Sequence, residues 1–427
     1  MNRSILMKTM KRSLLYLLGC LATLQAAIAQ APTATDAGRG NIVITGIVKE
    51  QDSRRKLDNV SIKLAGSNVG TVSNADGVFS LKVSREELSH GVTASHIGYL
   101  NAHLSAEEIE RQGRNITIWM TPSDFSLNEV IIYGGDPRDL VEEAIAKIPD
   151  NYPEQEQMYT AFYRETIQKR RRYISVSEAV VDVYKTGYAT QEIYRDKVQV
   201  VKGRRLVSQK RSDTLAVKVV GGPAIALHMD LVKHGDDLLN LREIAHYDFT
   251  LETPASLDNR MHHVVSFRPR HVVDYALYSG RLYIEQKSLS LTRAVYEVDM
   301  SDRYKATRCI LHKKPTGLRF MPREISFLIT YKQQEGKTYL NYVSNTIRFK
   351  CDWKRRLFSS TYTTHAELVM VDRTDLAGES IKLRDSFRPR EVFYDKVDEY
   401  WDEDFWKDYN IIEPTESLES AVNKLKK

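Results

Sequence analysis

The chain is poor in the residues and motifs that mark the common reaction classes. It has three cysteines in 427 residues, and none of them form a Cys-x-x-Cys pair. A His-Glu-x-x-His motif, a Gly-x-Ser-x-Gly elbow and a glycine-rich phosphate loop ahead of a helix are also absent. We therefore expect no enzyme: no catalytic residue, no cofactor-binding residue and no metal ligand is predicted.

Long apolar runs are missing as well. After residue 29, no run approaches the roughly 18 apolar residues that a membrane-spanning helix needs. The sequence therefore predicts no transmembrane helix in the mature chain.

The first 29 residues have the three parts of a secretory signal peptide. Basic residues end at Lys11-Arg12, an apolar stretch runs from Leu14 to Leu24, and Ala27-Ile28-Ala29 is a small-x-small cleavage site. We predict cleavage after Ala29, export, and a mature chain that is periplasmic or associated with the outer membrane. A buried N-terminal helix is the alternative.

Cys20 keeps another interpretation open. Leu17-Leu18-Gly19-Cys20 is similar to a lipobox, and acylation of Cys20 would anchor the chain to a membrane. However, the apolar run before Cys20 is very short and continues past it to Leu24. We therefore favour cleavage at Ala29 over lipidation.

The positive charge gives no argument for nucleic-acid binding. The net charge is +6, but four basic residues lie in the predicted signal peptide, and removing them leaves +2. We expect an envelope protein or a lipid as the partner, and no nucleic acid.

Residues 42–123, after a linker over 30–41, have the pattern of a β-sandwich. The predicted strands cover Ile42 to Val48, Val60 to Leu64, Phe79 to Val83, Val92 to Ile97 and Ile116 to Met120. Asn74 to Gly77 is a tight turn, and Ser105 and Glu108 form the capping box of one short helix.

Ordered motifs in this segment resemble the carboxypeptidase-regulatory-like domain. They are Thr45-Gly46-Ile47-Val48, Asn59-Val60-Ser61-Ile62, Gly70 to Leu81, Ser95 to Tyr99 and Leu127 to Ile132. The resemblance covers about residues 42 to 133. It implies a prealbumin-like sandwich, as in TonB-dependent receptors and other envelope proteins of Gram-negative bacteria. That domain carries no catalytic residues, so the resemblance implies no peptidase activity.

Residues 124–150 are predicted to be a connecting strand and helix. Asp136 suits the N-cap and Pro137 the first helical position, and Ile148-Pro149 is expected to end the helix.

Residues 151–390 are again rich in β pattern, with longer strands. Those predicted cover Tyr173 to Tyr184, Arg281 to Gln286, Arg293 to Met300, Glu324 to Tyr331, Thr338 to Phe349 and Ser359 to Val371. Turns at Pro315-Thr316-Gly317 and Gln334-Glu335-Gly336 indicate antiparallel neighbours, and a helical insert is expected from about Ala224 to Leu241.

The fold class is therefore mainly β. We predict a sandwich, then a larger antiparallel sheet or half-barrel with a helical insert, and a helical tail over 391–427. In the tail, Glu416 to Lys427 is the predicted helix, and Trp401 and Trp406 are expected to cover a sheet edge. The larger domain resembles the C-terminal part of uncharacterised envelope proteins and, by architecture alone, a LolA-like lipoprotein carrier.

Few polar groups stand out as candidate sites. His228, Asp230 and His234 are an incomplete metal site or a helix-surface pair, and the rings of His262-His263 should point to opposite faces of a strand. Lys169 to Arg172 is a solvated hairpin turn, or else a contact for lipid head groups or an acidic partner.

The two remaining cysteines, Cys309 and Cys351, lie on predicted strands. They are either bridged or two buried free thiols.

We expect a non-enzymatic envelope protein that binds or docks an unknown ligand or partner. The alternative is a LolA-like lipid or lipoprotein carrier, which predicts an apolar concave face covered by the helical insert. A hydrolase with dispersed active-site residues is a third hypothesis. It requires a histidine, an acid and a nucleophile to converge within hydrogen-bond reach.

Overall fold

A computed structural model gives the fold of most of the chain from residue 41 onward. It describes residues 41–84, 86–113, 115–123, 133–189, 195–210, 213, 217–219, 221–234, 238–354, 359–374, 380–401 and 409–425. The predicted signal peptide with Cys20 and Ala29, the linker up to residue 40, the Leu127 to Ile132 motif and Trp406 lie outside these residues. From Ile42 on, the chain forms one compact unit.

Two small sheets form the N-terminal domain, as predicted. One has the order β4–β1–β7, with β1 and β7 parallel, and the other has the order β3–β2–β5–β6. The bounds are β1 (Asn41–Glu50), β2 (Ser61–Leu64), β3 (Gly70–Val72), β4 (Val78–Ser84), β5 (Val92–Ser95), β6 (Ala102–Leu104) and β7 (Asn115–Met120). Their alternating apolar residues, among them Val48, Ile62 and Phe79, meet in one core.

Local signals in this domain are confirmed. Gly77 takes a positive φ of 72° in the predicted turn. The short helices are η1 (Glu87–His90) and α2 (Ala106–Gln112), and Ser105 and Glu108 form the capping box of α2.

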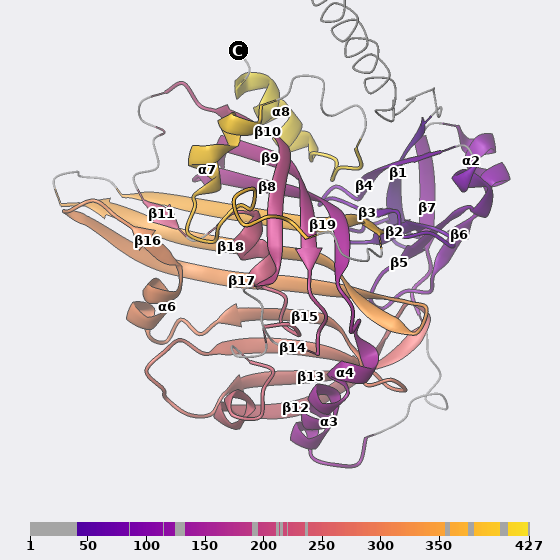
Figure 1. Cartoon of the computed structure of the whole chain (residues 1–427), viewed down its shortest axis with the longest axis horizontal. Coiled ribbons are helices and arrows are strands. Elements are labelled where there is room, and N and C mark those ends of the chain that lie inside the picture. Colours follow the sequence, from indigo (N-terminus) through magenta and orange to yellow (C-terminus); the bar gives the residue numbers. More distant parts are fainter. Residues whose placement is uncertain are drawn as a thin grey trace, which may run out of the picture. The chain divides into compact units, whose positions relative to one another are not determined.

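The second part is a ten-stranded antiparallel sheet (Figure 1). Its order is β10–β9–β8–β19–β18–β17–β15–β14–β13–β12. The bounds are β8 (Gln157–Lys169), β9 (Arg172–Lys185), β10 (Lys197–Val207), β12 (Tyr247–Leu257), β13 (Arg260–Pro269), β14 (Tyr278–Glu285), β15 (Leu291–Val298), β17 (Leu318–Gln334), β18 (Lys337–Trp353) and β19 (Ser360–Thr374). A separate two-stranded ladder joins β11 (Lys218–Val219) to β16 (Leu311–Lys313).

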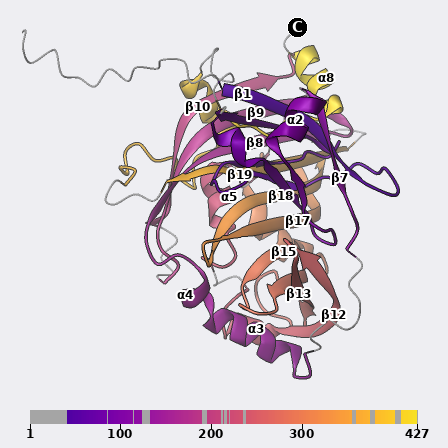
Figure 2. The same ribbon diagram turned by 90° about the vertical axis from the view of Figure 1, so that its right-hand side faces the viewer.

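Short helices cover parts of this sheet. They are α3 (Pro137–Ala146), α4 (Ile148–Asn151), α5 (Pro223–His228), η6 (Glu243–His246), α6 (Arg303–Ile310), α7 (Phe393–Lys396), η7 (Val397–Tyr400) and α8 (Glu416–Leu425). Figure 2 shows α3 and α4 beside the β12 and β13 end of the sheet. The side chain of Asp136 caps α3 by accepting from the N–H of Arg138, as its sequence predicts. None of the helices in the described parts is long and apolar enough to cross a membrane.

Three local expectations are wrong. The helical insert is α5 followed by turns, rather than one helix to Leu241. The turn at Pro315 to Gly317 leads from β16 into β17, and β16 pairs with β11 instead. Cys309 lies on α6, not on a strand, because Asp302 caps that helix through the N–H groups of Tyr304 and Lys305. Cys309 is exposed and Cys351 is buried, and the two thiols are not bridged to each other.

The sandwich and the tail both pack on one face of the large sheet. Val72 of β3 joins Phe162, Tyr342 and Ile412 in a shared apolar cluster. The tail helix α8 buries Leu418 and Val422 against Val176 of β9. Trp401 bridges to Gly203 on the edge strand β10 through its backbone, but its side chain stays half exposed. The backbone of Trp401, rather than its ring, therefore lies along this part of the sheet edge.

Candidate functional site

Strand β8 lies near one end of the large sheet and presents two different faces. Because successive side chains of a strand alternate, Arg164 points to the face covered by the sandwich and tail, and Glu165 points to the other. The register places Glu165 opposite Ser177 of β9 and Ala366 of β19, and Ala366 opposite Asn345 of β18. The next row on the same face contains Ser175, Ile167 and Thr364. Both rows are dominated by small side chains.

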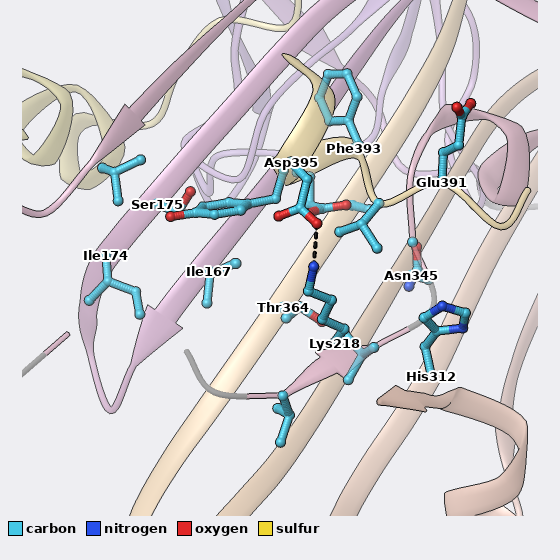
Figure 3. Close-up of a pocket in the computed structure, with 18 of the residues that line it drawn as sticks. Ile167, Ile174, Ser175, Lys218, His312, Asn345, Thr364, Glu391, Phe393 and Asp395 are labelled. Atoms are coloured by element: carbon cyan, nitrogen blue, oxygen red, sulfur yellow. Dashed lines mark hydrogen bonds and ion pairs between the residues drawn. The ribbon is translucent and has the colours of Figure 1, made fainter. Parts of the chain in front are cut away.

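These small side chains leave room for a cavity of about 220 Å³ above the strands. Elsewhere on this face, large residues such as Tyr159, Tyr163 and Leu340 fill the core. The walls of the cavity are largely apolar and come from β8, β9, β10, the β11 segment and α7. They include Ile167, Ile174, Val207, Val217, Val219 and Phe393. Figure 3 shows several of these side chains around the space.

Glu165 provides the charge on the floor of the cavity. Its carboxylate accepts a hydrogen bond from the Tyr163 hydroxyl (2.9 Å), whose oxygen in turn accepts from the N–H of Gly222 (3.0 Å). Burial raises the pKa of Glu165, and the hydrogen bonds that it accepts only partly offset this effect. Gly221 lies so close to this carboxylate that a Cβ atom there would be 2.9 Å from Oε2. A larger residue at this position would therefore require the Glu165 carboxylate to shift.

Two serine hydroxyls on the same face have no hydrogen-bond partner among the described residues. Ser175 is 2% exposed and lines the cavity, and Ser177 is 1% exposed in the neighbouring row. Neither Oγ atom forms a hydrogen bond with another part of the described chain. A buried hydroxyl without a partner is unfavourable, so the cavity offers unused hydrogen-bonding capacity at its floor.

The rim carries the remaining charged groups. Lys218 and Asp395 form an ion pair across the opening, drawn as a dashed line in Figure 3. Arg390, Glu391 and His312 also line the cavity. Figure 3 places His312 and Ser175 on opposite sides of the space, so these two residues do not form a nucleophile and base pair.

The opposite face of β8 is fully paired. Arg164 donates to Glu178 (2.7 Å), to Glu367 (3.2 Å) and to the carbonyl oxygen of Ile412 (2.6 Å). Glu178 accepts a further bond from Arg204 of β10 (2.6 Å). The register aligns these four charged residues in one row across β19, β8, β9 and β10, with alternating sign.

The predicted His228, Asp230 and His234 group does not form a site. Asp230 follows the end of α5 and is fully buried, where it pairs with Lys185 (2.6 Å) and accepts from Tyr188 (2.7 Å) and Tyr331 (2.8 Å). The expected helix-surface pair is therefore wrong. In the described part of the chain, no three His, Cys, Asp or Glu residues are arranged to hold a metal ion.

Two other polar groups lie where the sequence predicts. His262 and His263 are successive residues of β13, one lining a small cavity beside the sandwich and the other packed edge-on against Tyr133. Lys169 to Arg172 form the exposed hairpin turn between β8 and β9. Arg172 there binds Asp213 (2.5 Å).

Sequence reasoning missed Glu165 and Ser175. Glu165 is one of 56 acidic residues and has no motif around it. The only available signal was the row of small and polar residues in strands that otherwise carry large apolar ones. Reading that row requires the register of four strands, which lie between Gln157 and Thr374 in the chain.

Comparisons with known proteins identify the N-terminal domain. Residues 44–132 match the family described as CarboxypepD_reg-like domain, which confirms the resemblance for this part of the chain. A part of this chain, 58% of its length, also aligns with 96% of the crystal structure of a DUF1329 family protein from Desulfovibrio piger, at 10% identity and a TM-score of 0.25. No curated protein matches the sequence.

Proposed function

We propose that this chain is a non-enzymatic cell-envelope protein whose large sheet binds a partly apolar ligand in the cavity over β8. The sandwich domain would serve as a docking or stabilising module. The observation that carries the proposal is the cavity itself, in which apolar walls surround a buried polar floor with an unpaired Ser175 hydroxyl. Export rests on the signal-peptide pattern that ends at Ala29.

Packing considerations support a binding role. Protein interiors are close-packed, and voids larger than a water molecule are few. A cavity of about 220 Å³ forfeits dispersion contacts along its walls. A ligand that restores those contacts and forms a hydrogen bond with Ser175 would be stabilised by both interactions. Apolar walls with a few polar groups are typical of small-molecule sites.

A carrier of the LolA-like kind is the second candidate. The insert that begins with α5 does cover an apolar face, because Leu227, Leu231 and Leu239 pack into the main core. These side chains fill the space beneath the insert. A carried lipid would therefore occupy the neighbouring cavity. The volume of that cavity, about 220 Å³, suits a lipid with one acyl chain better than a lipid with several.

Filling the cavity tests the proposal. Ala366 lies in the middle of the floor, and Ala366→Leu would place a larger side chain in the space. We expect the native protein to bind the neutral fluorophore N-phenyl-1-naphthylamine saturably, and Ala366→Leu to weaken that binding by about tenfold or more with little change in stability.

Ala106→Leu, on helix α2 of the sandwich, is the matched control and should bind like the native protein. Fluorescence titration measures both variants. Equal binding by the native protein and Ala366→Leu, or no saturable binding by the native protein, would exclude this cavity as the site.

A further inference from the structure

Glu165 is a carboxylate with no ion-pair partner among the residues that the structure describes. Its partners are the Tyr163 hydroxyl and the backbone near Gly222, and no ion pair joins it to another described residue. Two basic residues of the neighbouring elements are already engaged in ion pairs. Lys218 pairs with Asp395 at the rim. Arg205, which lies two strands away in the same row, pairs with Asp398.

Hydrogen-bond acceptors surround Glu165 on the floor. Ser175 lies one row away on the adjacent strand, and its unpaired hydroxyl can accept as well as donate. Asn345 lies beyond Ala366, a side chain too small to separate the two polar groups. An ammonium group has three donors and no acceptor, so it matches a carboxylate, a hydroxyl and an amide oxygen.

Resting on the proposed function, we infer that the cavity binds a primary amine that carries an apolar chain. The ammonium group sits on Glu165 and Ser175, and the chain lies against Ile167, Val217 and Phe393. The amine supplies the positive charge that Glu165 lacks, and it satisfies the Ser175 hydroxyl.

The charges in the lining disfavour an acidic head group. Among the lining residues that the structure describes, four are acidic, Glu165, Asp213, Glu391 and Asp395, and two are basic, Lys218 and Arg390. Asp213 and Asp395 have cation partners, which leaves the negative charge of Glu165 at the floor. A carboxylate head would face that charge in a partly buried site, where repulsion is weakly screened.

Three amphiphiles that differ only in the head group test the inference on the native protein. Octylamine, 1-octanol and octanoate would each displace N-phenyl-1-naphthylamine in a fluorescence titration. We expect octylamine to bind at least about tenfold more tightly than 1-octanol, the factor for a hydrogen bond to a charged group, and octanoate to bind most weakly.

Three variants test which residues cause the expected preference for octylamine. Glu165→Gln should lose about tenfold in octylamine affinity and keep its affinity for 1-octanol, and Ser175→Ala should lose a smaller factor. Glu297→Gln makes the same change on the exposed face of β15 and should leave all three affinities unchanged.

The outcomes separate the two proposals. If none of the three amphiphiles binds, the proposed function fails. If all three bind alike, if octanoate binds most tightly, or if Glu165→Gln leaves octylamine affinity intact, the cavity remains a ligand site and the amine preference is overturned. The head-group comparison uses the native protein, so it holds even if a variant fails to fold.

Discussion

Arg164 and Glu165 are neighbours on β8, yet their surroundings differ in kind. The guanidinium of Arg164 contacts two carboxylates and a backbone carbonyl, and each of those carboxylates has a further partner. The carboxylate of Glu165 faces a cavity, and its partners among the described residues are a hydroxyl and the backbone near Gly222. On one face of the strand, the charged residues form a completed row in which each charge has a partner of opposite sign. On the other face the row is incomplete, because Glu165 has no such partner among the described residues.

This difference distinguishes buried charges that stabilise the fold from a buried charge that we propose binds a ligand. A completed buried network holds the sandwich and tail on the sheet, because Arg164 also binds the tail carbonyl of Ile412. An incomplete one costs stability in the free protein and becomes favourable when a ligand completes it. The comparison therefore predicts opposite responses to mutation on the two faces.

Removing the centre of the completed row should have the largest effect. Arg164→Met leaves Glu178 and Glu367 buried without their shared cation, which should cost about 3–5 kcal/mol. Urea unfolding measures this loss. Lys147→Met is the control, because the Lys147 and Asp150 side chains are 53% and 65% exposed, and it should leave the stability essentially unchanged. A loss below about 1 kcal/mol for Arg164→Met would mean that this row of charges does not stabilise the fold.

Lowering the pH should weaken the ion pairs on this same face of β8. Burial alone would raise the pKa of Glu367, but the nearby His365 ring and the Arg164 charge outweigh burial and lower the pKa from 4.5 to about 2. The native state therefore keeps this group ionised where the unfolded chain has protonated it. Its contribution is complete above pH 4.5 and is lost as the pH falls toward 2.

We expect this loss to be about 2–3 kcal/mol for the native protein. Urea unfolding at a series of pH values measures it. Glu367→Gln should be less stable at neutral pH and should show a shallower decline over the same window. Parallel curves for the two proteins would contradict the assigned pKa.

Local sequence signals predicted the elements well wherever neighbours in the chain decide the structure. The Ser105 capping box and the Asp136 N-cap are confirmed, as is the hairpin turn at Gln334 to Gly336. The insert after Gly222 was mispredicted because Asp230 leaves the helix to bind Lys185, which lies 45 residues earlier. A partner so distant in sequence is invisible to helical periodicity.

The candidate site could not be predicted for the same reason. The alternating pattern of β8 places Arg164 and Glu165 on opposite faces, which the sequence alone could indicate. It could not indicate that Arg164 meets Glu367, some 200 residues away, or that the residues opposite Glu165 on the neighbouring strands are small. The functional meaning of each charge depends on register, and register is set by tertiary packing.

The most direct test compares one substitution on the two faces at neutral pH. Glu178→Gln removes a carboxylate that Arg164 and Arg204 hold at a lowered pKa despite its burial, and Glu165→Gln removes one whose pKa burial raises. The account predicts that urea unfolding shows a loss of about 2 kcal/mol for Glu178→Gln and a gain of about 0.5–1 kcal/mol for Glu165→Gln. Comparable destabilisation by both substitutions would contradict it.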